Sequence, residues 1–211
     1  MSGILAVWND RSDAIKREYE YWYNTEHIPE RLALPGFRTA RRFEAVDADR
    51  TFFTYYDLDS PDVMLTPVYT ERLSNPTPQT KSMMPHFSGM VRSVFSETAR
   101  EGNGFGNGLG AALVVVRYMT GTPAELPRAV LESVERSEII SARLWHPAAA
   151  NVRTETAESK TRAQPDGVAS GAIVIETMRD DAATAIATSL RHSAGSDVSV
   201  GRYRLLCAFN T

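Results

Sequence analysis

The sequence predicts an α+β protein in which two βαββαβ units close their antiparallel sheets into one barrel. Three observations support this expectation. A glycine-rich stretch divides the 211 residues almost equally, and the predicted elements follow the same order in both halves. Each half also has apolar strand faces that its two helices cannot cover.

The dividing stretch is Glu101–Gly110, in which five of ten residues are glycine. Glycine loses more conformational freedom on folding than any other residue, so such a stretch is typical of a linker. The expected organisation is a first unit over residues 1–100, a linker over 101–110 and a second unit over 111–211.

Alternating and β-branched apolar runs predict the strands, and helical periodicity predicts the helices. In the first half these are a strand at Ile4–Trp8, a helix over most of Ser12–Leu34, strands at Phe37–Val46 and Thr51–Leu58, a helical and irregular region at Ser60–Phe87, and a strand at Met90–Glu97. In the second half they are a strand at Ala112–Met119, a helix at Pro123–Ser137, strands at Ile139–His146 and Gly171–Met178, a helix at Asp181–His192 and a strand at Val198–Phe209.

Two helices cover one face of a four-stranded sheet and leave the other open. That open face is also apolar, because Phe53 and Tyr55 alternate with Thr54 and Tyr56. Packing the two open faces together buries both, so we expect tandem ferredoxin-like repeats that form one α+β barrel. The polar stretch Asn151–Ser170 is expected to be a long surface loop.

Composition argues against several classes of function. The net charge of −3 and the pI of about 5.8 offer no basic face for nucleic acid. A single cysteine, Cys207, excludes an intrachain disulfide and a zinc-thiolate cluster. No apolar run approaches the roughly 20 residues of a membrane span, and the apolar start is too short for a signal peptide. The expected location is the cytoplasm.

The most unusual segment is Glu18–Arg42, where two carboxylates share the apolar face of a helix. Glu26 and Glu30 lie on this face, and His27 flanks it one turn after Tyr23. Because a buried carboxylate is costly without a partner, Glu26 is expected to face a polar cavity or mark a departure of the helix from the core. Pro29 favours a kink or stop near Thr25–Ile28.

A histidine at such a break suits general acid–base chemistry near neutral pH. The alternative interpretation is structural, with His27 capping the helix and Glu26 paired with Arg31 or Arg41. The second half has no Glu-His pair at the corresponding place. This asymmetry favours a functional site in the first half.

The string W-Y-N-x-E-H-I-P-E-R-x-x-x-P-G-F, Trp22 to Phe37, resembles the helix-to-strand signature of the dimeric α+β barrel superfamily, close to its EthD-like branch. The later Tyr55–Pro61 is similar to that superfamily's step from a strand into the second helix. Members handle small, often aromatic molecules as cyclases, lactone isomerases, cofactor-free monooxygenases or haem enzymes. They bind ligands between sheet and helices.

The resemblance implies His27 as the catalytic acid or base, with Glu26 or Asp57 as its orienting partner. It implies a substrate-binding wall of Trp22, Tyr23 and Tyr55. We add Arg41 and His86 as candidate ligand contacts, because His86 follows a methionine-rich segment that could cover the cavity. One chain would supply both halves of the barrel, and a further homodimer is possible.

Other histidines and metal sites are weaker candidates. His146 at a strand end and His192 at a helix end are expected to be structural, although either could in principle ligate a haem. Cys207 is expected to be an inert core thiol. Adjacent Glu26 and His27 point about 100° apart and rarely chelate one ion, so no metal or cofactor is expected.

The sequence thus favours a cofactor-independent enzyme of the cyclase, isomerase, lyase or monooxygenase type. Its substrate would be a small apolar carbonyl, lactone or phenolic compound, and its partners would include neither nucleic acid nor membrane. The alternative is a binding or accessory protein that uses the same cavity without catalysis.

Overall fold

The fold is an eight-stranded antiparallel barrel, closed in the order β1-β3-β2-β8-β5-β7-β6-β4. The computed structural model describes residues 2–102, 108–132, 138–151, 155–162 and 164–211. The strands are β1 (Gly3–Arg11), β2 (Phe37–Asp47), β3 (Phe52–Leu58), β4 (Phe87–Gly102), β5 (Ala112–Tyr118), β6 (Ile139–Pro147), β7 (Gly171–Thr177) and β8 (Val198–Asn210). The predicted α+β barrel with antiparallel pairing is confirmed.

Two seams join the halves of the barrel. β2 pairs with β8 from Thr39↔Asn210 to Asp47↔Arg202. β4 pairs with β6 from Phe95↔Pro147 to Gly102↔Ser141. Because both seams run antiparallel, every strand has a neighbour on each side and the sheet has no free edge.

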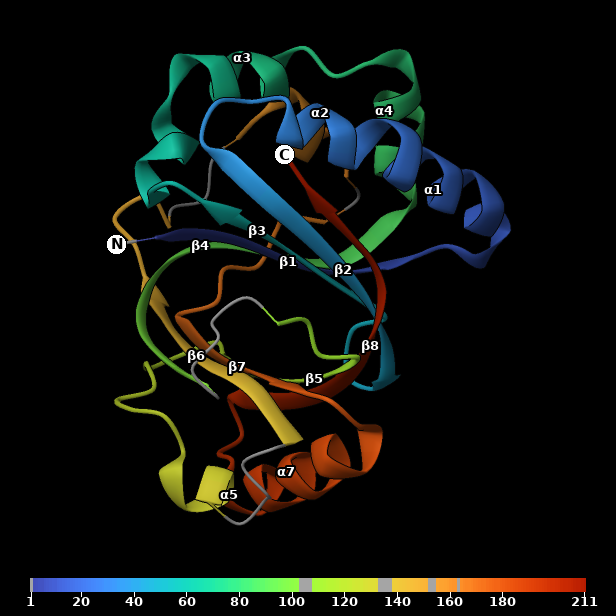
Figure 1. The fold of residues 1–211 in the computed structure, drawn as a ribbon. Coiled ribbons are helices and arrows are strands. Elements are labelled where there is room, and N and C mark those ends of the chain that lie inside the picture. The colour runs from blue at the N-terminus through green and yellow to red at the C-terminus, as the bar shows by residue number, and fades with distance from the viewer. Residues whose placement is uncertain (1, 103–107, 133–137, 152–154, 163) are drawn as a thin grey trace.

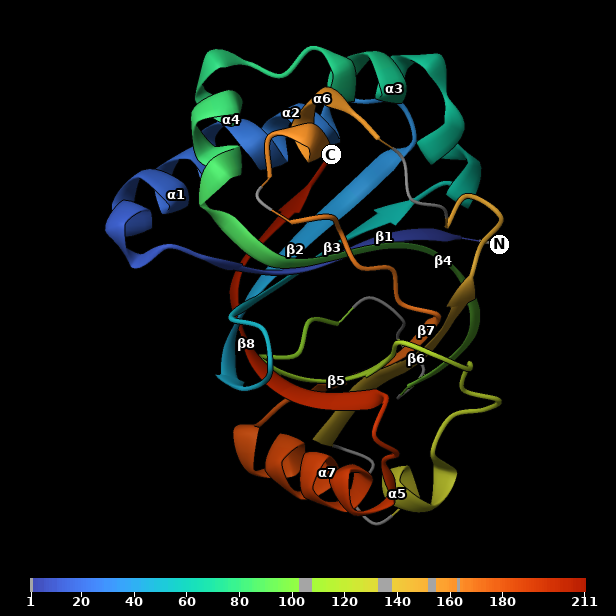
Figure 2. The same ribbon diagram turned by 180° about the vertical axis from the view of Figure 1, so that it is seen from behind.

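The helices lie at opposite ends of the barrel (Figures 1 and 2). At one end are α1 (Lys16–Trp22), α2 (Ile28–Leu32), α3 (Pro67–Ser74), α4 (Pro78–Met83) and the short α6 (Ala157–Lys160). At the other are α5 (Arg128–Glu132) and α7 (Asp180–Ser193). No described helix is long and apolar enough to cross a membrane.

The alternation of side chains along β3 decides which residues meet. Phe53 and Tyr55 point into the barrel, where both sheets contribute to one aromatic core. Phe52 and Tyr56 point the other way, into the core beneath α1–α4. Successive side chains of a strand face opposite sides, so adjacent tyrosines serve two different compartments.

The first helical region contains a π-helical turn, Tyr23–His27, between α1 and α2. The N–H of Ile28 donates to the Tyr23 carbonyl, five residues back. This wide turn accommodates Pro29, which has no N–H for the ordinary ladder. The break expected near Thr25–Ile28 is therefore a local widening, and the helix continues to Leu32. Such bulges often occur at functional sites.

The stretch expected to be a surface loop instead packs onto the first half. We call residues 155–162 and 164–168 the α6 segment. Gly167 forms a parallel bridge with Val91, its N–H donates to the Met90 carbonyl at 2.7 Å, and its carbonyl accepts from the Arg92 N–H at 3.0 Å. The sequence showed polarity here but not these distant partners.

The boundaries of the predicted helix at Pro123–Ser137 and of the predicted linker at 101–110 differ from those in the structure. The helix expected at Pro123–Ser137 is α5, which begins only at Arg128, because the residue before Pro127 avoids the helical region; residues 133–137 lie outside the described part. Of the expected linker, residues 101–102 extend β4 and residues 103–107 lie outside the described part.

The aromatic interior makes a testable prediction about stability. Phe53 is fully buried, and its ring lies 4.8 Å from Trp8 and 5.7 Å from both Tyr55 and Tyr203 between centroids. Phe53→Ala should lower the free energy of unfolding by about 3–5 kcal/mol, measured by urea denaturation.

The control is Val46→Ala, which truncates a side chain that is 45% exposed. It should change the free energy of unfolding by less than about 0.5 kcal/mol. Similar losses in the two variants would contradict a shared interior core.

Candidate functional site

A cavity of about 70 Å³ lies between the helix-facing side of the first sheet and the helices that cover it. Its wall is formed by strands β1, β3 and β4, the π-helical turn, α2, α3, Met84 and the α6 segment. The lining residues are Leu5, Val7, Tyr23, His27, Arg31, Tyr56, Tyr69, Leu73, Met84, Phe87, Met90, Arg92, Thr156, Glu158, Ser159, Arg162, Asp166 and Val168. Apolar and aromatic walls with a few charged groups are typical of small-molecule sites.

His27 ends the π-helical turn and faces this cavity. Its ring packs 4.5 Å from the Trp22 ring and 5.1 Å from the Tyr23 ring, between centroids. Nδ1 is buried without a hydrogen-bond partner among the described residues. The ring is otherwise only half-buried, so Nε2 is the nitrogen that a ligand in the cavity can approach.

The surroundings of His27 favour its neutral form. Burial lowers its pKa well below the usual 6.5, and the nearby charges of Arg31, Arg42 and Arg162 lower it further. The residue is therefore an unprotonated imidazole at neutral pH. In this state it is able to accept a proton but has none to donate as a cation.

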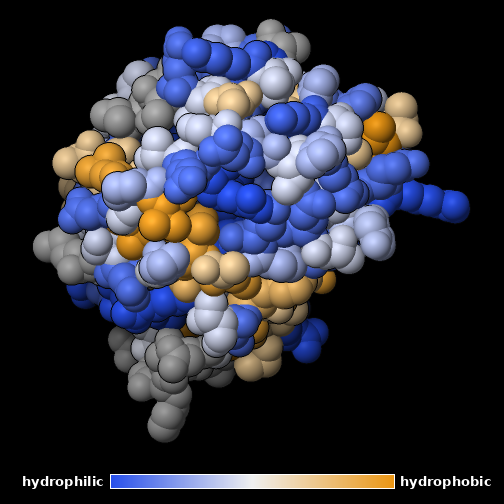
Figure 3. Space-filling view, turned by 90° about the horizontal axis from the view of Figure 1, so that it is seen from above, coloured by the Kyte–Doolittle hydropathy of each residue, from blue (hydrophilic) through white to orange (hydrophobic). Residues whose placement is uncertain are grey.

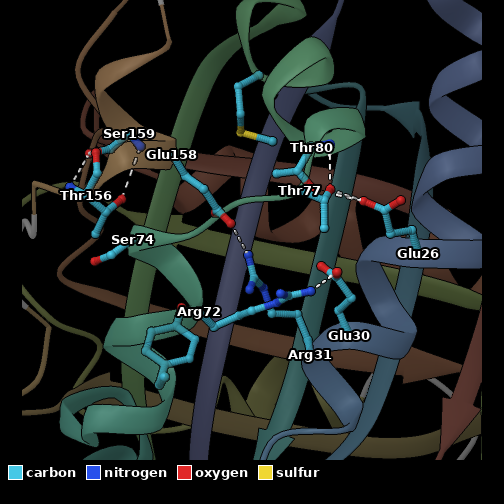
Figure 4. A network of polar contacts seen from close by, with 12 residues as sticks. Glu26, Glu30, Arg31, Arg72, Ser74, Thr77, Thr80, Thr156, Glu158 and Ser159 are labelled. Atoms are coloured by element: carbon cyan, nitrogen blue, oxygen red, sulfur yellow. Dashed lines mark hydrogen bonds and ion pairs between the residues drawn. The ribbon is translucent and has the colours of Figure 1, made fainter.

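Arg31 and Glu158 form a buried ion pair across the cavity wall (Figure 4). Arg31 Nη2 lies 2.6 Å from Glu158 Oε1, and the two residues are 3% and 7% exposed. This pair ties α2 of the first half to α6 of the second. Arg31 Nη1 has no hydrogen-bond partner in the part of the chain that the structure describes, so part of the guanidinium remains available.

Two more arginines line the cavity. Arg162 is paired with Asp166 through two hydrogen bonds of 2.8 and 2.5 Å. Arg92 on β4 donates from Nη2 to the Tyr69 hydroxyl at 2.8 Å and has no carboxylate within ion-pair distance among the described residues. On the helix-facing side of β3, the buried Tyr56 hydroxyl also lacks a partner.

The sequence-predicted residues of the helix fall into two groups. Tyr23 lines the cavity beside His27, and Trp22 lies behind His27 with its Nε1–H donating to Thr80 Oγ1 at 3.2 Å. Glu26 points away from the cavity towards Thr77 and Thr80 on the α4 side (Figure 4). It therefore does not orient the imidazole in this structure.

Asp57, Tyr55 and Arg41 lie inside the barrel, on the opposite side of the sheet. Asp57 accepts from Arg143 at 2.5 Å and from Thr39 at 2.6 Å. Burial alone would raise its pKa, but Arg143 and Thr39 hold the pKa below its usual value. The carboxylate is thus ionised and already paired with Arg143. It lies on the side of the sheet opposite His27.

Tyr55, Arg41 and Glu176 form a second buried polar cluster inside the barrel. Arg41 Nη1 lies 2.7 Å from both the Tyr55 hydroxyl and Glu176 Oε1, and the tyrosine donates to the same carboxylate at 3.0 Å. The alternation along β3 sends Tyr55 and Asp57 inward and Tyr56 towards the helices. Because side chains alternate along a strand, Tyr55 cannot belong to the predicted aromatic wall near Trp22, which lies on the other side of the sheet.

The remaining candidates lie outside the cavity wall. His86 is half-buried and absent from the lining, although Met84 from the same segment contributes to it. His146 contacts Thr98 Oγ1 and the Pro123 carbonyl, both at 2.7 Å. His192 contacts the Thr188 carbonyl at 2.7 Å near the end of α7. Cys207 on β8 is half-buried near Asn24 and packs against the core beneath α1–α4.

The polar cavity residues that the sequence did not predict include Arg31, Tyr56, Arg92, Glu158 and Arg162. Tyr56 was recoverable, because strand alternation places it on the side opposite Tyr55. The others depend on long-range packing of the α6 segment, for which a single sequence carries no signal.

Comparison with known proteins places the fold. No protein-family model matches the chain, and no curated protein matches it in sequence. Among solved structures, an anthrone oxidase-like protein has a TM-score of 0.59 at 9% identity, over 99% of this chain and 92% of its own.

Two further structures agree. A Fusobacterium nucleatum subsp. nucleatum protein assigned as a monooxygenase has a TM-score of 0.55 at 9% identity, over 99% of this chain and 94% of its own. A protein assigned as a chlorite dismutase has a TM-score of 0.54 at 13% identity, over 98% and 95%. This chain shares their ferredoxin-like α+β barrel fold over nearly its whole length.

The described residues do not fit a haem, which needs an axial ligand and a large pocket. Both nitrogens of His146 already have partners, and His192 is exposed at the end of α7. The cavity beside His27, at about 70 Å³, has no room for a porphyrin ring.

The neutral state of His27 predicts a pH effect on stability. Its pKa is lowered in the folded state, so the unfolded state binds the proton more readily and stability falls as pH drops below about 6.5. Removing this residue in His27→Gln should reduce that loss by up to about 1.4 kcal/mol per pH unit. Urea denaturation at pH 7.5, 6.5 and 5.5 measures the difference.

The control is Ser189→Ala at an exposed position of α7, which removes no titratable group and should keep the wild-type pH dependence. Identical pH profiles for wild type and His27→Gln would contradict a lowered pKa at His27.

The buried ion pair predicts how the α6 segment is held. Glu158→Ala leaves Arg31 buried without its partner, which should lower the free energy of unfolding by about 3–5 kcal/mol. Trypsin should then cleave faster after Lys160 and Arg162, because the segment loses its attachment to α2. Urea denaturation and mass spectrometry of timed digests measure the two effects.

Glu155→Ala is the control, because Glu155 is exposed and its contact with Lys160 is 3.7 Å long. It should leave stability and cleavage unchanged. Equal cleavage of the Glu158→Ala variant and wild type would show that the ion pair does not hold the segment.

Proposed function

We propose that this protein is a small-molecule enzyme in which His27 acts as the general base. The observation that carries the proposal is an unpaired, neutral imidazole at an apolar cavity that also holds arginines. Its substrate class is a small, largely apolar carbonyl, lactone or phenolic compound. The reaction would be of the cyclase, isomerase, lyase or monooxygenase type.

The first step is proton transfer from the substrate to Nε2 of His27. The proton comes from a carbon next to a carbonyl group or from a phenolic hydroxyl. The electron pair left behind moves to the substrate oxygen, which becomes an enolate or phenolate. A nearby anion raises the pKa of His27 again, so the proton is held while the anion exists and can return at another position.

Arg31 and Tyr56 can donate hydrogen bonds to the new oxyanion. Arg31 Nη1 and the Tyr56 hydroxyl are buried at the cavity and have no acceptor among the described residues. Fixed donors aimed at developing negative charge are a major source of catalysis in enclosed sites. Such proton transfer needs no redox group, so we propose that the reaction is independent of a cofactor.

The fold comparisons support an enzyme of this kind through the names of the neighbours, which include an anthrone oxidase-like protein and an assigned monooxygenase. The Glu26–Pro29 string supports a position near the EthD-like branch. The barrel closes within one chain, so the proposal requires no second subunit. We propose a cytoplasmic location, because the sequence has neither a membrane-length apolar run nor a recognisable signal peptide.

A second candidate is a protein that binds or delivers the same ligand without reacting it. One observation favours it: no carboxylate of the described residues orients His27 through Nδ1, whereas catalytic histidines are commonly positioned by such a partner.

Exchange of substrate protons with solvent tests the proposal without knowledge of the full reaction. The protein would be incubated in D2O with small aryl ketones, aryl lactones and phenyl-substituted 1,3-diketones, and NMR would follow loss of the α-proton signals. His27→Gln should lower the catalysed exchange rate about 10²–10⁴-fold.

His192→Gln should exchange at the wild-type rate, because this histidine lies at the opposite end of the barrel. Exchange at the wild-type rate in a folded His27→Gln variant would remove His27 as the base. Binding without exchange across the panel would contradict catalysis and favour the second candidate.

A further inference from the structure

The positive and negative charges of the side chains that line the cavity do not cancel. Among its described lining residues, three are arginines and two are carboxylates, and His27 is neutral at pH 7. One positive charge therefore remains. An uncompensated charge in a partly enclosed, apolar site attracts a counter-charge strongly, because water screens it poorly there.

The excess charge is located on Arg92. Arg31 is paired with Glu158 and Arg162 with Asp166. Arg92 instead donates to the neutral Tyr69 hydroxyl, and its Nη2 lies 3.7 Å from Met64 Sδ. Its guanidinium also lies 5.9 Å from the centre of the Tyr69 ring. These contacts fix the guanidinium in position but leave its charge uncompensated.

Two features hold Arg92 at the cavity wall. Its strand neighbour on β1 is Val7, which also lines the cavity. On its other side its backbone N–H donates to Gly167 of the α6 segment at 3.0 Å. The side chain is half-buried, so it is neither fully hydrated nor paired with a carboxylate.

The other unpaired groups at the cavity need acceptors too. Arg31 Nη1 can only donate, and the Tyr56 hydroxyl has a free proton. A neutral carbonyl would satisfy one donor but leave the charge of Arg92. A carboxylate offers two oxygens and about four lone pairs, and it pairs with guanidinium in a planar, bidentate geometry.

We propose that the ligand of this cavity is a small monoanion, a carboxylate on an apolar or aromatic body, whose anionic group pairs with Arg92. This inference rests on the proposed function for the use of the cavity. It adds that the reacting carbonyl or phenol belongs to a molecule already charged before reaction, with the carboxylate serving for binding and not for chemistry.

Benzoate and benzamide test this inference, because they match in size and differ in charge. Isothermal titration calorimetry at pH 7.5 should show benzoate binding at least about 10-fold more tightly than benzamide to wild type. Arg92→Gln should abolish this preference. Arg92→Lys keeps the charge but loses the bidentate fork, so it should keep part of the preference.

The matched control is Arg128→Gln. Arg128 has a side chain that is 67% exposed and lies on α5 at the opposite end of the barrel (Figure 1). This variant should retain the full preference for benzoate. Near-ultraviolet circular dichroism confirms that each variant keeps its tertiary structure.

Three results would overturn the inference: equal affinities for benzoate and benzamide in wild type, binding of neither compound, or an unchanged preference in Arg92→Gln. The outcome is separable from that of the proposed function. Exchange of neutral ketone protons should still depend on His27 in the Arg92→Gln variant, and benzoate preference should persist in His27→Gln.

Discussion

The structure depends on the burial of two apolar sheet faces against each other. Each four-stranded sheet is covered by helices on one side, and the opposite sides meet in a shared aromatic interior that includes Trp8, Phe53 and Trp145. Neither half could leave these side chains in water without losing the main favourable contribution to folding. Closing both seams also removes every sheet edge, so backbone pairing and side-chain burial favour the same arrangement.

This closure explains why the candidate site lies on the outer side of the sheet. The barrel interior is filled by aromatic rings and by paired charges such as Asp57 with Arg143. Beneath α2 the packing is incomplete, and the π-helical turn brings His27 to the space that remains. The α6 segment of the second half closes this space through Glu158, so both halves build one site. The end of the molecule seen from above is mostly hydrophilic with separate apolar patches (Figure 3), and the apolar cavity wall lies beneath this surface.

Local patterns in the sequence carried most of the fold and part of the site. Strand alternation and the glycine-rich stretch predicted the antiparallel α+β barrel, and His27 and Tyr23 from the segment with the unusual composition line the cavity. The same alternation, followed consistently, would have separated Tyr55 and Asp57 from Tyr23. The pairing of Arg31 with Glu158 was beyond reach, because it joins residues 127 positions apart through a short helix with little periodicity. The polar composition of Asn151–Ser170 suggested a surface loop. In the structure, Glu158 of this stretch forms a buried ion pair with Arg31.

The seam between β2 and β8 has a consequence for synthesis on the ribosome. β8 is translated after the other seven strands of the barrel, so the outer edge of β2 has no partner until β8 has left the ribosome. An exposed strand edge beside an open aromatic face is the kind of surface that chaperones bind and that pairs with other nascent chains. If the first half folds before β8 is available, its sheet stays unclosed during that time. Loss of the last strand through a premature stop codon would make that vulnerable state permanent.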